Sequence, residues 1–326
     1  MDSKLHIVEQ LTSLETDAHF NAMVEAVYAH QLEFNAPFRT FVHGLIGSAA
    51  FSHDHPPFVP VELWKHHVFS CASEHQGVFK SSGTTGAERS EHHVSDLGWY
   101  RTLAVHHFES LYGPLADQVI LALLPSYLEN GDSSLVYMVE TFAQQADPRS
   151  AFLMKQPDEL KEALTTLKSA GQRTTLIGVS YALLDLVDGW SIDFPELTVM
   201  ETGGMKGRKR ELTRNELHTT LRVGFPSSPI HSEYGMTELL SQGYMMNGSA
   251  FIPPKWMRAY ATEISDPMRI MPQGQRGLLA FIDLANVDSC AFVQTRDIGI
   301  VYPDGTFSVE GRLDHSDLRG CNLLYT

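Results

Sequence analysis

Four hydroxyl side chains and two glycines stand together in residues 80–86, "KSSGTTG". Glycines let backbone N–H groups approach an anion closely, and hydroxyl groups add further hydrogen-bond donors. The segment could therefore grip a phosphate chain, or it could be a solvated Ser/Thr loop. It is not a Walker A loop, because no Lys-Ser/Thr pair follows the second glycine and the glycine spacing differs.

A second group of chemically useful residues lies in residues 231–244, "HSEYGMTELLSQGY". Tyr234, Thr237 and Glu238 offer an aromatic ring, a hydroxyl and a carboxylate within five residues. The ring could stack on a base, the hydroxyl could bind a phosphate oxygen, and the carboxylate could hold Mg²⁺, which prefers oxygen ligands. The alternative is an aromatic residue of the core beside a threonine that caps a helix.

A third group lies in residues 295–321, "TRDIGIVYPDGTFSVEGRLDHSDLRGC". The pattern predicts that Asp297 sits between two strands and that Arg312 follows a turn and a further strand. A carboxylate can accept hydrogen bonds from two ribose hydroxyls at once. The alternatives are a turn residue for Asp297 and a surface ion pair for Arg312.

In this order and spacing, the segments resemble the motifs of the adenylate-forming superfamily. That superfamily includes acyl-CoA ligases, phenylacetate–CoA ligases and the adenylation domains of peptide synthetases. Its phosphate loop resembles "SSGTTG", its adenine turn "YGMTE", its ribose motif "TRDIG" and its hinge "GRLDHSDLRG". The resemblance covers residues 60–326. It implies an α/β large domain with parallel or mixed sheets flanked by helices, a β-rich subdomain, and no small C-terminal lysine domain.

The resemblance also implies ATP and Mg²⁺ as cofactors and gives roles to residues. Thr237 would touch the α-phosphate and Glu238 would coordinate Mg²⁺. Asp297 would hold the ribose hydroxyls, with Arg312 nearby. The β- and γ-phosphates would be cradled by Ser81, Ser82, Gly83, Thr84, Thr85 and Gly86.

The adenine base would lie against a second set of residues. Tyr234 would stack on it, next to Gly235. Gly203 and Gly204 belong to "METGGMKG", where the family has a glycine-containing segment beside the base. In most relatives the phosphate loop continues Gly-x-Pro-Lys. Here Arg89 stands at the lysine position, so either Arg89 replaces the lysine or that contact is lost.

One branch of the superfamily, the acyl-protein synthetases of bioluminescent bacteria's fatty acid reductase complexes, ends near the same point. The segments "FVPVELWK", "VFKSSGTTG" and "LRGCNLLY" resemble it. The resemblance implies that a fatty acid is activated as acyl-AMP and transferred to Cys321, then to an acyl-accepting reductase or carrier protein. The alternative for Cys321 is a small apolar residue after a turn. Cys71 and Cys290 stand in apolar contexts, which favours buried, inert thiols.

Two other functions remain open. The chain could be the large domain of an acid–CoA ligase whose lysine-bearing domain is a separate polypeptide. It could also be a non-catalytic nucleotide-binding relative.

Composition limits the partners. Acidic residues outnumber basic ones by 39 to 24, which gives a net charge of −15 and argues against nucleic acid or an anionic membrane surface. The three cysteines are widely spaced, so neither a disulfide framework nor a zinc cluster fits, and we expect a cytoplasmic protein. The sequence shows neither a signal peptide nor an apolar run that could span a membrane.

Hydrophobic periodicity predicts strands that alternate with helices up to about residue 243, as in an α/β protein with a parallel sheet. Four short strands follow, in a β-rich subdomain of about residues 243–310. We therefore expect a large N-terminal domain over 1–310 and a hinge-like tail over 311–326. The predicted strands of the first part are 117–126, 173–180 and 196–204. The predicted helices are 4–34, 95–113, 134–146, 158–171 (capped by Asp158 and ended by Gly171), 182–188 and 213–225.

Overall fold

The computed structural model describes residues 10–47, 50–82, 88–124, 131–203, 212–246 and 248–313. The chain divides into two compact units. Unit 1 contains residues 1–100, 237–241 and 252–326, and unit 2 contains residues 101–236 and 242–251. The chain thus passes from unit 2 to unit 1 between Met236 and Thr237, within the "YGMTE" motif. The domain boundaries predicted near residues 243 and 310 stay predictions.

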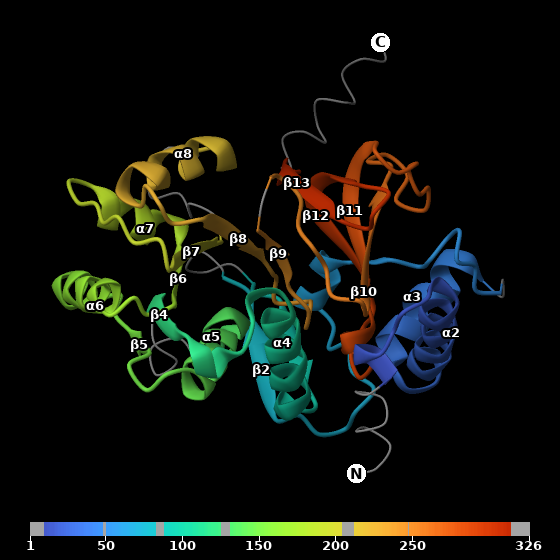
Figure 1. Cartoon of the computed structure of the whole chain (residues 1–326). Helices are drawn as coiled ribbons and strands as arrows, with labels where there is room; N and C mark the ends of the chain where they lie inside the picture. Colours follow the sequence, from blue (N-terminus) through green and yellow to red (C-terminus); the bar gives the residue numbers. More distant parts are fainter. Residues whose placement is uncertain are drawn as a thin grey trace. The chain divides into compact units, whose positions relative to one another are not determined.

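A six-stranded sheet forms the centre of unit 2, with the strand order β5-β4-β6-β7-β8-β9 (Figure 1). Neighbours from β5 to β8 are parallel, and β9 is antiparallel to β8. Every residue of β4 and β6 is buried, as expected for apolar strands inside a parallel sheet. The predicted α/β class is confirmed. The strands are β4 (Val119–Leu123), β5 (Ala151–Phe152), β6 (Thr174–Val179), β7 (Leu197–Thr202), β8 (Ile230–Tyr234) and β9 (Gly243–Met245).

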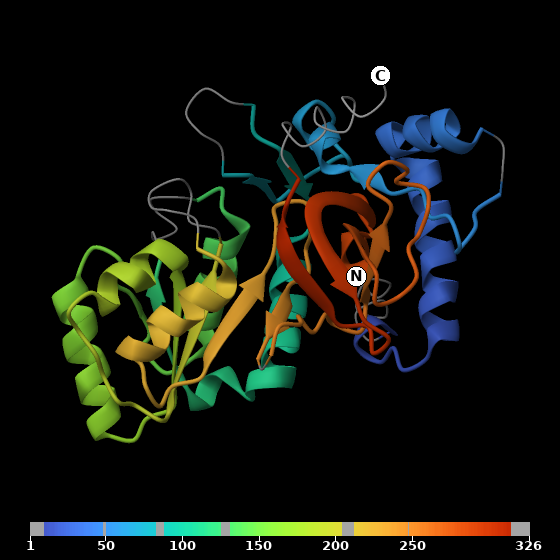
Figure 2. The same cartoon turned by 90° about the horizontal axis from the view of Figure 1, so that it is seen from above.

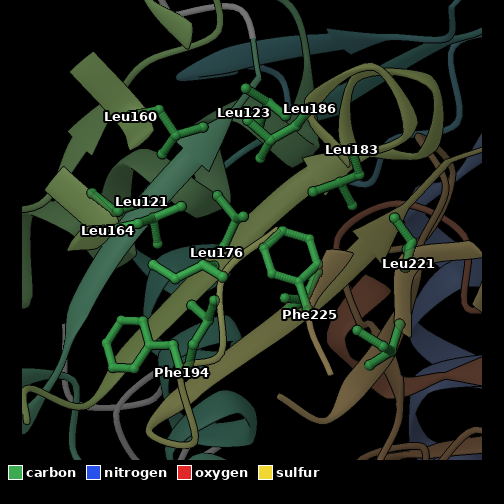
Figure 3. Packing of buried hydrophobic residues seen from close by; sticks show 14 of the residues in the cluster. Leu121, Leu123, Leu160, Leu164, Leu176, Leu183, Leu186, Phe194, Leu221 and Phe225 are labelled. Atoms are coloured by element: carbon green, nitrogen blue, oxygen red, sulfur yellow. The ribbon is translucent and has the colours of Figure 1, made fainter. Parts of the chain in front are cut away.

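Helices cover this sheet and close its hydrophobic core. Leu160 and Leu164 of α6 lie over Leu121 and Leu176 of β4 and β6, and all four side chains are almost completely buried (Figure 3). Full burial of a leucine side chain stabilises a fold by about 2 kcal/mol. The helices are α4 (Leu97–Tyr112, whose first turn belongs to unit 1), α5 (Ser134–Gln145), α6 (Pro157–Ser169), α7 (Ser180–Val187) and α8 (Arg214–Gly224), with a short 3-10 helix η2 (Leu115–Asp117).

The predicted N-cap of α6, Asp158, is wrong by two residues. The N-cap is Gln156, and Pro157 begins the helix. Proline is favoured there because its fixed φ suits the first helical turn and the missing N–H would have no helical partner. Asp158 therefore lies inside the first turn, where its charge complements the helix dipole. Gly171 follows the end of the helix with φ +59°, as expected of a helix-ending glycine.

Unit 1 is built on a five-stranded sheet in which β12 is central. One edge of β12 pairs with β11, which pairs with β10, and the other edge pairs with β1 and β13. A separate antiparallel pair joins β2 to β3. The strands are β1 (Val59–Pro60), β2 (Gly77–Lys80), β3 (Glu91–Val94), β10 (Met257–Thr262), β11 (Arg276–Asp283), β12 (Phe292–Val301) and β13 (Phe307–Arg312), with short 3-10 helices η1 (Val61–Lys65) and η3 (Leu284–Asn286).

The helix predicted over 4–34 is interrupted. Helix α2 (Asp17–Phe34) begins only after Thr16, whose side chain accepts a hydrogen bond from the His19 N–H at 3.2 Å. The Ser/Thr-rich segment "LTSLETD" favours caps over helix interior, which explains the break. Helices α2 and α3 (Ala36–Ile46) meet at a corner at Asn35 (Figure 2). Within the described residues no helix is long and apolar enough to cross a membrane.

Two buried amides at this corner fix a distant loop of unit 1. The Gln31 side chain donates to the carbonyl of Asn286 at 2.8 Å, and the Asn35 side chain donates to the carbonyl of Ser289 at 2.7 Å. Both side chains are completely buried. Residues 286–289, which run from the last residue of η3 into the connection to β12, are therefore held in place by the helices.

Candidate functional site

The five residues that follow "YGM" are held by buried polar side chains. The Asp283 carboxylate accepts hydrogen bonds from the N–H groups of Leu240 and Ser241, both at 3.0 Å, and from the Ser241 hydroxyl at 2.6 Å. The Asn286 side chain donates to the Glu238 carbonyl at 2.8 Å. This stretch has no regular secondary structure, so these side chains satisfy backbone groups that a helix or sheet would otherwise satisfy. The segment has a defined conformation as a result.

Glu238 is the most unusual side chain of this segment, because it is a carboxylate with only 5% of its surface exposed. Burial raises its pKa, while a hydrogen bond with the Ser90 side chain and the positive charge of Arg312 act in the opposite direction. The charge of Asp297 raises the pKa further. Unit 1 therefore brings together Ser90, Glu238, Asp297 and Arg312, three of which the sequence placed in one site.

Asp297 and Arg312 lie opposite each other on the antiparallel strands β12 and β13. The prediction that Asp297 sits between two strands is wrong, since β12 runs without interruption through it. The carboxylate is half-buried and Arg312 is exposed. The pairing of β12 with β13, rather than a turn, therefore places Asp297 beside Arg312.

The base of the predicted phosphate loop is closed by hydrogen bonds between Ser81 and Ser90. The Ser81 N–H donates to the Ser90 carbonyl at 3.0 Å, and the Ser90 N–H donates to the Ser81 hydroxyl at 2.9 Å. The Arg89 guanidinium donates to the carbonyls of Lys80 and Ser81. The Arg89 side chain thus binds the backbone at the base of the predicted phosphate loop. Ser82 is exposed beyond it.

In unit 2, Gly203 and Tyr234 come at the carboxyl ends of the adjacent parallel strands β7 and β8. Thr202 and Glu233, the residues just before them, are register partners. Gly203 has φ +70°, a left-handed conformation that favours glycine, and its carbonyl accepts from the Ser180 hydroxyl at 2.7 Å. Tyr234 is half-buried, with its ring centroid 5.7 Å from that of Phe251. Ligands of α/β proteins bind at this edge of the sheet.

Below these residues lies a buried carboxylate pair that the sequence analysis missed. Glu201 accepts from the hydroxyls of Ser180 and Ser232, and Glu233 accepts from the Thr202 hydroxyl. Burial raises the pKa of Glu233 to about 7, and the nearby Glu201 adds to the rise. A Cβ on Gly235 would lie 2.5 Å from the Glu233 Oε1, so glycine here leaves room for the carboxylate.

Other sequence expectations have mixed outcomes. Cys290 is buried as expected, but Cys71 is partly exposed. Burial and the charge of Asp288 raise the pKa of Cys71 to about 12, so it is a neutral thiol near pH 7.

Some predicted site residues lie outside the described residues: Gly83, Thr84, Thr85, Gly86, Gly204 and Cys321. The prediction that Tyr234 and Asp297 bind one nucleotide joins residues of different units and stays a prediction.

His92 was also missed, because the adjacent pair His92-His93 gave no reason to assign a role. It is completely buried on β3, and burial lowers its pKa to about 4, so the ring is neutral. Its partners, Thr237 and Ser289, lie far away in the chain. The sequence offers only a weak indication that Asp283 has a structural role, namely that this acidic residue ends the apolar run "GLLAFID".

A scan against family models finds no match for this sequence, and neither does a search among curated proteins. Comparison with solved structures is positive. A complex of 2-hydroxyisobutyryl-CoA ligase with 2-HIB-AMP superposes with a TM-score of 0.67 over 93% of this chain and 69% of that one, at 15% identity. The chain has the fold of the adenylate-forming large domain. That part of the sequence-based prediction is confirmed.

Two further structures share the fold over a smaller part of the chain. ATP-bound MatB from Rhodopseudomonas palustris has a TM-score of 0.54 and 14% identity over 72% of this chain. The luciferase-like enzyme from the mealworm Zophobas morio has a TM-score of 0.51 and 18% identity over 73% of this chain. The chain matches 47% of MatB and 57% of the mealworm enzyme. It therefore spans about half the length of these proteins.

Proposed function

We propose that this chain is an ATP-dependent enzyme that activates a carboxylic acid, of the fatty acid class, as an acyl adenylate. The observation that carries the proposal is the gathering of Ser90, Asp297 and Arg312 around the buried carboxylate of Glu238. The fold adds support, since structures that share it include complexes with ATP and with an acyl-AMP.

The residues around Glu238 fit a magnesium ion. Within the described parts of the chain no three His, Cys, Asp or Glu side chains form a metal site of their own. Mg²⁺ bound with nucleotides needs only one or two carboxylates, since phosphate oxygens and water complete its shell. Glu238 would supply that carboxylate, and Mg²⁺ would neutralise phosphate charge.

In the first step, a carboxylate oxygen of the acid attacks the α-phosphorus of ATP. A new O–P bond forms, the bond to the β-phosphate bridge breaks, and pyrophosphate leaves. We propose that the Thr237 hydroxyl donates to the α-phosphate, that Asp297 accepts from the ribose hydroxyls, and that Arg312 adds positive charge. Such positioning and charge stabilisation supply most of the catalysis in phosphoryl-type transfers.

Acid-dependent exchange of labelled pyrophosphate into ATP tests this step. Straight-chain acids of graded length should support exchange, with a maximum at long chains. A protein that only binds nucleotides would give none with any acid. The absence of exchange across the whole panel would therefore remove the proposal.

For the second step we propose transfer to Cys321. The thiolate attacks the acyl carbonyl carbon, the carbon–oxygen bond to AMP breaks, and AMP leaves as the thioester forms. The Cys321→Ser variant should keep pyrophosphate exchange but lose the label from radioactive fatty acid. Cys71→Ser is the matched control and should label normally, because the pKa of Cys71 is raised to about 12. Labelling of Cys321→Ser at the wild-type level would exclude this acceptor.

A second candidate function is favoured by the similarity to 2-hydroxyisobutyryl-CoA ligase. In this second candidate function, the present chain forms the acyl adenylate, and a separate lysine-bearing polypeptide helps to transfer the acyl group to coenzyme A. Product analysis with coenzyme A, with and without candidate partner proteins, distinguishes the two. Acyl-CoA formed at the rate of AMP release would favour this function over transfer to Cys321.

A further inference from the structure

The proposed mechanism makes no use of His92, although it is the completely buried histidine of β3. Its strand follows the predicted phosphate loop in the chain. Side chains alternate along this strand, so that His92 and Val94 are buried while Glu91 and His93 are more exposed. His93 therefore lies on the opposite face of the strand from His92.

Both nitrogens of the His92 ring are hydrogen-bonded. Nδ1 lies 2.7 Å from the Thr237 carbonyl oxygen, and Nε2 lies 2.9 Å from the Ser289 hydroxyl. A carbonyl only accepts hydrogen bonds, so Nδ1 must carry the proton. In the neutral ring Nε2 then accepts from the Ser289 hydroxyl. These two bonds fix the ring's tautomer and its orientation.

We infer that His92 is a positioning residue, which holds the backbone at Thr237 so that the Thr237 hydroxyl and the Glu238 carboxylate face the reacting phosphate. The inference rests on the proposed function and deepens it. Thr237 and Glu238 are consecutive, and the Asn286 side chain holds the next carbonyl, that of Glu238, at 2.8 Å. Buried side chains thus hold both carbonyls of this dipeptide.

The anchor of His92 is itself fixed by the fold. The carbonyl of Ser289 accepts a hydrogen bond from the Asn35 side chain at 2.7 Å. A displacement of about 1 Å at a reacting group can cost about a hundredfold in rate. Loss of the Nδ1 hydrogen bond should therefore lower the rate of adenylation more than it lowers the affinity for ATP.

Two substitutions of similar polarity separate positioning from packing. In His92→Asn the side-chain amide can reach the position of Nδ1 and still donate to the Thr237 carbonyl. In His92→Gln the amide reaches the position of Nε2 instead and keeps only the Ser289 side. We expect the maximal exchange rate to stay within about threefold of wild type in His92→Asn and to fall at least about tenfold in His92→Gln.

The control is His93→Asn, on the opposite face of the same strand, which should exchange within about twofold of wild type. Thermal midpoints of the two His92 variants should agree within a few degrees. The ¹⁵N NMR spectrum of the wild type should show a neutral His92 ring protonated at Nδ1. Equal exchange rates in the His92→Asn and His92→Gln variants, or a ring protonated at Nε2, would overturn the inference.

The outcomes also separate this inference from the proposed function. If the wild type exchanges pyrophosphate and the two variants do not differ, adenylation stands and positioning by His92 falls. If the wild type gives no exchange with any acid, both fall.

Discussion

At the scale of single residues, the site depends on a carboxylate that the fold keeps nearly free of water. Burial disfavours the charged form of Glu238, whereas the hydrogen bond from Ser90 and the charge of Arg312 favour it. A divalent cation would favour it further. Glu238 is therefore a buried carboxylate whose charged form depends on its polar and charged neighbours.

The first prediction concerns the metal. The Glu238→Gln substitution keeps size and polarity but removes the negative charge, so exchange at saturating Mg²⁺ should fall by about a hundredfold or more. Exchange measured over a Mg²⁺ titration checks this. Glu310→Gln is the control, since Glu310 pairs with Arg276 at 2.9 Å on the surface, and it should leave exchange unchanged. Wild-type Mg²⁺ dependence in Glu238→Gln would refute the assignment.

The second prediction concerns the buried Glu233. Its pKa is about 7 in the folded state, whereas the ordinary pKa of a glutamate side chain in water is 4.5. Between pH 4.5 and pH 7 the folded state therefore binds more protons than the unfolded state. The raised pKa adds to the free energy of unfolding in full below pH 4.5, and this contribution is lost as pH rises through 7. Glu233→Gln imitates the protonated form and should be more stable than wild type at pH 8, by up to about 3 kcal/mol.

Thermal or denaturant unfolding from pH 5 to pH 8.5 measures this effect. The advantage of Glu233→Gln over wild type should shrink as pH falls toward 5. An advantage that is the same at every pH, or that grows toward pH 5, would contradict the raised pKa.

At the scale of secondary-structure elements, the position of Arg312 depends on how β13 pairs with β12. The register shifts between Ile298 and Gly299, one residue after the Asp297–Arg312 pair. A Cβ on Gly299 would lie 1.9 Å from the Ser308 carbonyl oxygen, a backbone atom of β13. Glycine is therefore required for this close approach of the two strands.

The third prediction follows from this approach. Gly299→Ala should push β13 away from β12, lower the free energy of unfolding by about 2–4 kcal/mol, and raise the KM for ATP because Arg312 moves. Denaturant unfolding and exchange kinetics measure the two effects. Gly311→Ala on the same strand pair is the control, because a Cβ there meets nothing within 4 Å. Equal effects of the two substitutions would argue against a special role for the close approach at Gly299.

Elements with a single dominant signal could be predicted from the sequence. The apolar run of β4 and the β-rich end of the chain are examples, because buried strands are rich in apolar residues. Strand β8 was missed since it reads "IHSEY" and looks polar. Its polar side chains are nevertheless buried, because each finds a partner elsewhere: His231 with Tyr112, Ser232 with His218 and Glu201, and Glu233 with Thr202.

The candidate site likewise contains residues that a local sequence pattern marks and residues that only long-range contacts place there. The roles of Glu238, Asp297 and Arg312 stay predictions, but their proximity could be predicted because their local spacing resembles a family pattern. The residues that hold them could not, because their contacts are long-range. His92 reaches Thr237 across 145 positions of the chain, and Asp283 reaches Leu240 across 43. No local pattern reports a contact of this kind.

At the scale of the whole molecule, the proposed function requires an acidic chain with net charge −15 to bind a strongly anionic nucleotide. Local charge can oppose the net charge, and unit 1 places the positive charge of Arg312 near Glu238. The fold is shared with ligases that bind ATP and an acyl-AMP, but this chain spans only part of their length. The chemistry of the whole protein must therefore be measured directly.

The most direct measurement follows the oxygen atoms of the acid. A long-chain acid labelled with ¹⁸O in both carboxylate oxygens is incubated with the protein, Mg²⁺ and ATP, and the products are examined by mass spectrometry. Attack on the α-phosphorus followed by acyl transfer leaves one ¹⁸O in AMP, with unlabelled pyrophosphate. We expect this result. Recovery of ¹⁸O in inorganic phosphate alongside ADP, or consumption of ATP without any label in AMP, would contradict it.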